Sequence, residues 1–232
     1  AKGPQDKYKI KGQVYTGRSI ITGIPKKKKP KYDDKKIIII GSGSGFFVTD
    51  QGHIVSNDHV VGVCKKVKAY EAGKEIYLDI LATDSVNDIG LVKGKFQNIK
   101  YLNIKTDGAE LGEDIVAFGY PLSQTLSDSV KLTKGIVSSL TGLGNNISQI
   151  QIDAAIQPGN SGGPVFNEKG ELIGMATSSI DSVQTQKVFG ATPQNVNFAI
   201  KSSYINSLLP NLPDTFIKQK GIVPVPVEEI GF

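Results

Sequence analysis

A serine lies between glycines in the stretch Gln157–Phe166, which reads QPGNSGGPVF. Ser161 could act as a nucleophile if a neighbouring base took its proton and a pair of donors held the oxyanion that forms. Gly159 allows the backbone to turn so that its own N–H and that of Ser161 point into one concavity, and the two glycines after Ser161 leave room for a substrate backbone. A solvent turn would use the same residue types. Acyl-transfer chemistry therefore requires a base and an orienting acid elsewhere in the chain.

Two histidines could supply the base. His53 stands beside a turn, after Asp50-Gln-Gly, and we expect it on the surface of a strand. His59 follows an apolar strand, where a short helical turn would hold its ring against the wall of a barrel. A half-buried ring with a purely structural role is the alternative. His59 is the candidate base.

A carboxylate near the start of another strand would accept the second imidazole N–H and fix the tautomer. Asp88 directly precedes the apolar run Ile89–Val92, which would shield it from water. Asp84 and Asp114 are rivals in more polar, turn-like settings. The order His59, Asp88, Ser161 is that of the chymotrypsin arrangement and differs from the serine-first order of α/β-hydrolases.

Composition argues against several other kinds of chemistry. Cys64 is the only cysteine and there are two histidines, so we expect no disulfide, no metal site and no cofactor. No uninterrupted apolar run reaches the roughly 18 residues that a membrane-spanning helix needs, so we expect no membrane span.

The positive charge is concentrated at the N-terminus. Residues 1–36 hold twelve Lys or Arg and three Asp, whereas the whole chain carries a net charge of +5. The lysine cluster in Pro25–Lys31 is expected to be a solvated loop; the alternatives are attraction to an anionic surface or assembly of a homo-oligomer through this segment. No base-reading motif accompanies the cluster, so no nucleic-acid partner is expected.

From residue 37 onward, short β-branched or aromatic runs are separated by Gly, Asn and Asp about every ten residues, which is typical of an all-β fold. We expect two six-stranded antiparallel β-barrels, at about 37–108 and 112–200, with helix after His59 and again at 203–209, and a tail at 210–232. The expected strands are 36–40, 45–49, 53–56, 66–70, 76–82, 89–93, 114–119, 130–138, 148–152, 164–167, 171–178 and 195–200.

Seven segments between residue 37 and about residue 206 resemble, in order and spacing, the HtrA/Deg branch of the trypsin-like serine proteases. The resemblance implies a chymotrypsin-like double barrel in which His59 is the base, Asp88 orients it and Ser161 is the nucleophile. It also implies an oxyanion hole made by the backbone N–H groups of Gly159 and Ser161. The segments are Gly43–Phe46, Ser56–Val61, Asp88–Lys93, Gly112–Pro121, Gly135–Ser138, Asp153–Pro164 and Asn197–Ile200.

The resemblance further implies a primary substrate pocket without a carboxylate. The position six residues before Ser161, where trypsins hold the acid that binds Lys or Arg, is Ala155. We therefore expect cleavage of unfolded or extended polypeptides after small or medium aliphatic residues, since burying an unpaired substrate cation would be costly. The expected pocket residues are Ala155, Ile156, Thr177, Ser178, Val196 and Phe198.

Membership in this branch would also imply a periplasmic or otherwise exported protein with a role in protein quality control. About 25 residues follow Asn206, too few for the PDZ domain that the branch usually carries, so we expect a protease domain without one. Asn160 stands where trypsins activated by cleavage have an Asp, so N-terminal processing is not expected to be required. A peptide-binding or chaperone-like module with little proteolysis is the alternative function.

Overall fold

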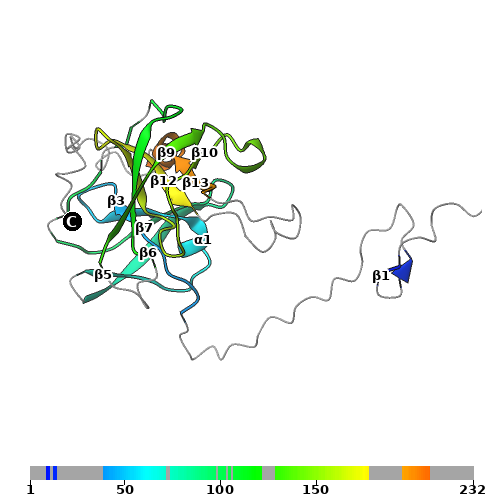
Figure 1. Ribbon diagram of the computed structural model, residues 1–232. Coiled ribbons are helices and arrows are strands. Elements are labelled where there is room, and N and C mark those ends of the chain that lie inside the picture. Colours follow the sequence, from blue (N-terminus) through cyan, green and yellow to red (C-terminus); the bar gives the residue numbers. More distant parts are fainter. Residues whose placement is uncertain are drawn as a thin grey trace, which may run out of the picture. The chain divides into compact units, whose positions relative to one another are not determined.

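The computed structural model describes residues 9–10, 13–14, 39–71, 74–97, 99–102, 104–105, 107–121, 129–177 and 195–209. The chain divides into two units, Ala1–Ile38 and Ile39–Phe232. In the first unit, β1 (Lys9–Ile10) and β2 (Gln13–Val14) pair as an antiparallel hairpin that the sequence pattern did not predict. The other described elements belong to the second unit (Figure 1).

The first half of the second unit is a five-stranded antiparallel sheet. A short helix, α1 (Asp58–Val61), follows its second strand and contains His59, so this helix begins one residue before His59 and not after it. The strand order is β3 (Phe46–Phe47), β4 (His53–Ser56), β7 (Ile89–Lys93), β6 (Lys74–Asp84) and β5 (Val67–Glu71).

The second half is a closed six-stranded barrel, as predicted. A 3₁₀ turn, η2 (Leu143–Asn145), connects two of its strands, and α3 (Ser202–Leu208) follows the last strand, which confirms the predicted C-terminal helix. Around the barrel the order is β10 (Gln149–Ile152), β13 (Asn197–Lys201), β12 (Leu172–Thr177), β11 (Pro164–Asn167), β8 (Asp114–Gly119) and β9 (Lys131–Ser139).

The prediction of a six-stranded, closed first barrel is wrong. Of the strand expected at 36–40, residues 36–38 lie outside the described residues, and residues 39–45 form no strand. Glycine at positions 41, 43 and 45 leaves this stretch without the side chains that stabilise a pleated strand. β3 is then two residues long and pairs only with β4, so no ladder closes the sheet onto β5.

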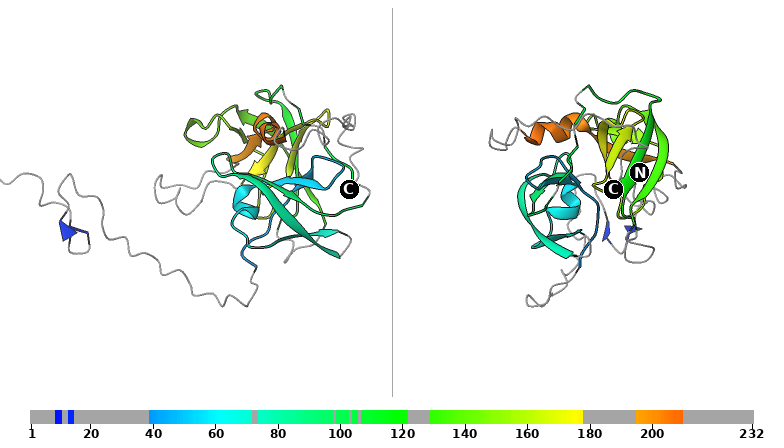
Figure 2. Two further views of the ribbon diagram at one scale, coloured as in Figure 1. Left: turned by 180° about the vertical axis from the view of Figure 1, so that it is seen from behind. Right: turned by 90° about the vertical axis from the view of Figure 1, so that its left-hand side faces the viewer.

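One apolar cluster belongs to both halves. Phe118 and Phe166 of the barrel pack edge to face, with ring centroids 5.7 Å apart. Because the cluster is continuous between the halves, the sheet and the barrel lie side by side (Figure 2), and residues from both can meet at one site. Its buried members are Phe46, Val48, Val55, Ile89 and Leu91 from the sheet side and Val116, Phe118, Phe166, Leu172, Met175, Ile200, Ile205 and Leu208 from the barrel side.

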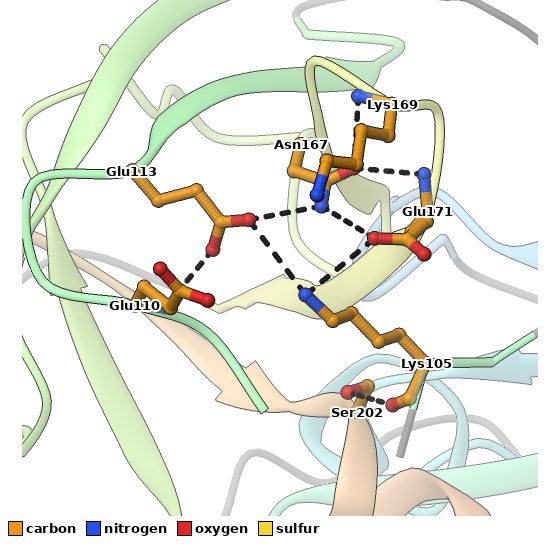
Figure 3. A network of polar contacts seen from close by, with 7 residues as sticks. All are labelled: Lys105, Glu110, Glu113, Asn167, Lys169, Glu171 and Ser202. Atoms are coloured by element: carbon orange, nitrogen blue, oxygen red, sulfur yellow. Dashed lines mark hydrogen bonds and ion pairs between the residues drawn. The ribbon is translucent and has the colours of Figure 1, made fainter. Parts of the chain in front are cut away.

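A polar network fixes the connection between the halves against the barrel (Figure 3). Lys105 Nζ in the connection lies 3.5 Å from Glu171 Oε2 and 3.9 Å from Glu113 Oε1. Asn167 Nδ2 donates to both carboxylates, at 2.8 and 2.9 Å. The hydroxyl of Ser202 donates to the Lys105 carbonyl at 2.5 Å, which ties the start of α3 to the same connection.

Candidate active site

His59 and Asp88 are joined where β4 ends and β7 begins, two neighbouring interior strands of the five-stranded sheet. His59 Nδ1 lies 2.8 Å from Asp88 Oδ2 and 3.0 Å from Oδ1, and the His59 backbone N–H donates to Oδ1 at 2.9 Å. α1 carries the histidine, and Asp88 stands in the turn just before β7 with φ of +57°, a conformation that non-glycine residues adopt rarely and at some cost in energy. This geometry holds the imidazole in one orientation and leaves its Nε2 for another partner.

Two further residues support Asp88. The hydroxyl of Thr177, at the end of β12, donates to Asp88 Oδ2 at 2.9 Å, and Asn57 Nδ2 donates to the Asp88 carbonyl at 3.1 Å. Burial raises the pKa of the Asp88 carboxyl, but the hydrogen bonds from the His59 ring, the His59 amide and Thr177 outweigh it, so the pKa lies below its usual value. The carboxylate is thereby kept ionised beside the imidazole.

Sequence reasoning missed both supporting roles. Thr177 was expected in the substrate pocket, but its hydroxyl faces Asp88, 89 positions earlier in the chain. No local pattern signals a partner at such a distance. Asn57 offered a weak signal, as a polar residue next to the helical turn that carries His59.

Ser161 lies on a tightly hydrogen-bonded loop and is 6% exposed. Gly159, with φ of +103°, and Gly162, with φ of +88°, adopt conformations that favour glycine, and the loop is closed by Asn160 N–H to the Gln157 carbonyl at 2.9 Å. Gly162 N–H donates to the Ala176 carbonyl at 2.9 Å, which anchors the loop on β12.

The amides of Gly159 and Ser161 differ from their neighbours in this loop. Both residues are buried, yet neither backbone N–H donates to an acceptor within the described part of the chain. Backbone N–H groups of buried residues are nearly always paired, so two unpaired ones on either side of Asn160 are suited to bind an anionic oxygen.

The Ser161 loop touches the sheet half directly. Ser44 N–H donates to the Ser161 carbonyl at 2.7 Å. A Cβ at Gly43 would lie 2.8 Å from a methyl of Val60, the residue after His59, and 2.9 Å from the Ser161 carbonyl. Glycine at position 43 therefore allows α1 and the Ser161 loop to approach closely. Among the described residues, no hydrogen bond joins Ser161 Oγ to the His59 ring.

The predicted pocket residues separate into groups. Val196 and Phe198 line a hollow of about 350 Å³, together with residues of the β9–β10 connection and Gln151, whereas Thr177 faces Asp88. Ile156 is buried in the barrel core and Ala155 is exposed. Ser178 lies outside the described residues.

The expectation that His53 is a surface residue is wrong. His53 is 1% exposed, because β4 is an interior strand between β3 and β7. Its Nδ1 shares a hydrogen bond of 2.7 Å with Thr49 Oγ1. Burial and the nearby charge of Lys93 lower the pKa of His53, against a smaller opposite effect of Asp50.

Neither a metal centre nor a membrane-spanning helix is found in the described ranges. They contain no group of three or more His, Cys, Asp or Glu side chains arranged to bind a metal ion. None of their helices has the length and apolar character needed to cross a bilayer.

Residues 43–175 match the family described as the trypsin-like peptidase domain. The chain belongs to this family. The matched range includes the sheet, His59, Asp88 and Ser161, and it ends within β12.

The relatives of this trypsin-like peptidase include proteases of the HtrA/Deg branch. An uncharacterised protein, y4bJ, of Sinorhizobium fredii is 39% identical over 169 residues, which cover 72% of this chain and 27% of that protein. A probable periplasmic serine endoprotease, DegP-like, of Hahella chejuensis is 32% identical over 196 residues, 82% of this chain and 39% of that protein. The chain thus spans well under half the length of these relatives.

A solved structure has the same fold. The crystal structure of the serine endoprotease from Yersinia pestis superposes with a TM-score of 0.62 at 28% identity, covering 76% of this chain and 59% of that one.

Proposed function

We propose that this trypsin-like peptidase is a serine endopeptidase that works through an acyl-enzyme. In this scheme Ser161 attacks the scissile carbonyl, His59 takes the serine proton and passes it to the leaving amine, and Asp88 fixes the histidine tautomer. The amides of Gly159 and Ser161 bind the oxyanion that forms. The two unpaired amides of these buried residues support the scheme most directly, because they provide donors before any substrate is present.

The contacts of Asp88 support the assignment of the base. Nδ1 of His59 faces both carboxylate oxygens, so its proton is held there and Nε2 is the nitrogen left to accept a proton from a serine. The imidazolium that forms is stabilised by the adjacent charge, because the pKa of Asp88 lies below its usual value.

The proposed substrates are unfolded or extended polypeptides, cut after small or medium aliphatic residues. We assign the substrate side chain to the hollow lined by Val196 and Phe198, which has no Asp or Glu among its described lining residues, so a substrate Lys or Arg would find no partner there. An extended peptide can pair as a strand with the barrel near Thr177.

The setting of the reaction is proposed from the relatives. We propose that the protein is exported, which the probable periplasmic relative of Hahella chejuensis supports. A role in protein quality control is part of the same proposal. Assembly of a homo-oligomer through residues 1–36 is proposed as well, and measuring the molecular mass of the chain with and without these residues would test it.

A peptide-binding module with little proteolysis is the second candidate function. It is favoured by one observation, the absence of a hydrogen bond between Ser161 Oγ and His59 among the described residues. Such bonds are often long in proteases without substrate and tighten when substrate binds, so proteolysis remains the better supported function.

A fluorophosphonate probe distinguishes the two functions. If the endopeptidase proposal is correct, the probe labels Ser161 alone, and Ser161→Ala abolishes both labelling and hydrolysis while the far-ultraviolet circular dichroism spectrum stays the same. Digestion of a denatured protein, with sequencing of the fragments, should give cuts mainly after Val, Ala, Ile or Leu. A majority of cuts after Lys, Arg or aromatic residues would refute the substrate proposal, and no labelling with no cuts would favour the binding module.

A further inference from the structure

All polar groups of Ser44 are hydrogen-bonded, and its N–H and hydroxyl connect the two halves. It lies in the glycine-rich segment before β3 and is 8% exposed. Besides the bond from its N–H to the Ser161 carbonyl, its own carbonyl accepts the hydroxyl of Ser56 at 2.7 Å. Its Oγ lies 2.7 Å from the Gly159 carbonyl and 3.0 Å from the N–H of Tyr120.

The direction of the Ser44 hydroxyl proton follows from its two neighbours. The N–H of Tyr120 can only donate, so Ser44 Oγ accepts from it, and the Gly159 carbonyl can only accept, so the hydroxyl proton points to it. A chain of two hydrogen bonds therefore runs from the end of β8 through Ser44 to the Ser161 loop. Hydrogen bonds in such a chain polarise and strengthen each other.

These bonds hold the peptide plane that follows each of the two unpaired amides. The Gly159 carbonyl is coplanar with the N–H of Asn160, and the Ser161 carbonyl with the N–H of Gly162, since peptide groups are planar. Within the described residues, the Ser44 hydroxyl is the only donor to the Gly159 carbonyl. Glycine at φ of +103° has no side chain to restrict its rotation, so this peptide plane is held by two bonds, from the Ser44 hydroxyl to its carbonyl and from its Asn160 N–H to the Gln157 carbonyl.

We infer that Ser44 is a positioning residue for oxyanion stabilisation. Its hydroxyl holds the Gly159 carbonyl and its amide holds the Ser161 carbonyl, so that the N–H groups of Gly159 and Ser161 keep one fixed orientation toward the developing charge. This role rests on the proposed peptidase function, and it adds a residue far from Ser161 in the sequence to the determinants of turnover.

Ser44→Ala tests the role because it removes the hydroxyl and keeps the backbone bond to Ser161. Removing a whole oxyanion donor lowers turnover about 10²–10³-fold, so disturbing the orientation of one donor is expected to lower kcat roughly 10- to 100-fold, with KM changed by less than about threefold. A peptide boronic acid, whose tetrahedral adduct places an oxygen at the same amides, should bind more weakly by a similar factor. A purely structural role would not weaken this inhibitor relative to the substrate.

Ser56→Ala is the matched control. It removes a buried hydroxyl that donates a bond of the same length to Ser44 itself, but among the described residues this hydroxyl donates to no carbonyl of the Ser161 loop. We expect a similar loss of thermal stability with kcat within about threefold of wild type. Ser44→Cys retains a weak donor, so its kcat and its affinity for the boronic acid should lie between those of wild type and Ser44→Ala. It serves as the test if the alanine variant does not fold.

Two results would overturn the role of Ser44. One is a folded Ser44→Ala or Ser44→Cys variant with unchanged kcat and inhibitor affinity, while wild type is labelled at Ser161. The other is an equal fall of kcat in Ser56→Ala. A wild type that the fluorophosphonate does not label would refute the endopeptidase function and this role together, so the two failures are distinguishable.

Discussion

The hydrogen bond from Thr177 to Asp88 gives a prediction whose size follows from the structure. Thr177→Val keeps the β-branched shape on β12 and removes the donor that lies 2.9 Å from Asp88 Oδ2. A hydrogen bond to a charged group contributes about 1.5–3 kcal/mol, and we expect the lower end, about 1.5 kcal/mol at neutral pH, because the Asp88 side chain is 25% exposed.

The unfolding free energy lost in Thr177→Val should decrease as the pH is lowered. The pKa of Asp88 is lowered in the folded protein, so its bonds stabilise the fold above the unfolded value of about 3.9 and stop doing so as the pH falls through the folded value. The difference in unfolding free energy between wild type and Thr177→Val should therefore be full at pH 7 and shrink as Asp88 becomes protonated.

Urea denaturation followed by circular dichroism measures this difference, since the chain has no tryptophan for fluorescence. Thr133→Val is the matched control, because the Thr133 hydroxyl is buried and has no hydrogen-bond partner in the part of the chain that the structure describes, so its removal should be neutral or stabilising. Equal losses in the two variants, or a Thr177→Val loss that does not shrink at any pH from 7 down to acid unfolding, would refute the reasoning.

Two further predictions concern Asp88 and His53. Asp88→Asn should lower kcat on the order of 10⁴-fold, because the imidazole loses the carboxylate that fixes its tautomer; hydrolysis of a peptide substrate measures this, and a fall of less than tenfold would contradict the assigned role. For His53, whose folded pKa is lowered, the unfolded chain binds the proton more tightly, so unfolding free energy should decrease as the pH falls below about 6.5. His53→Gln should show a weaker decrease in urea titrations between pH 7 and pH 5, and an unchanged pH dependence would count against this account.

The sequence was most informative where the signal was local. Eleven described strands of the second unit overlap the predicted β-branched or aromatic runs, and the glycines around Ser161 indicated the backbone conformations that the loop adopts. The burial of His53 could not be predicted from its own neighbours, because it results from β3 and β7 lying on both sides of β4. The prediction that the first sheet closes into a barrel failed for a similar reason, since closure depends on whether two distant edge strands are long enough to pair.

The contact between Thr177 and Asp88 could not be predicted from the sequence either. Thr177 was placed correctly on a strand near Ser161, but which of its neighbours the hydroxyl would meet depends on how the sheet and the barrel pack. The same packing determines the position of Ser44, which lies 115 positions before its partner Gly159.

The apolar cluster common to the sheet and the barrel also bears on the order in which the protein folds. Synthesis from the N-terminus completes the segment carrying His59 and Asp88 before β11 and β12 have been made. The bonds of Asp88 to Thr177 and of Ser44 to Gly159 join residues 89 and 115 positions apart, and contacts of such high sequence separation form late, after their loop-closure entropy has been overcome. A nascent or half-folded chain therefore lacks an assembled site. The proposed endopeptidase activity would arise only in molecules whose folding is complete.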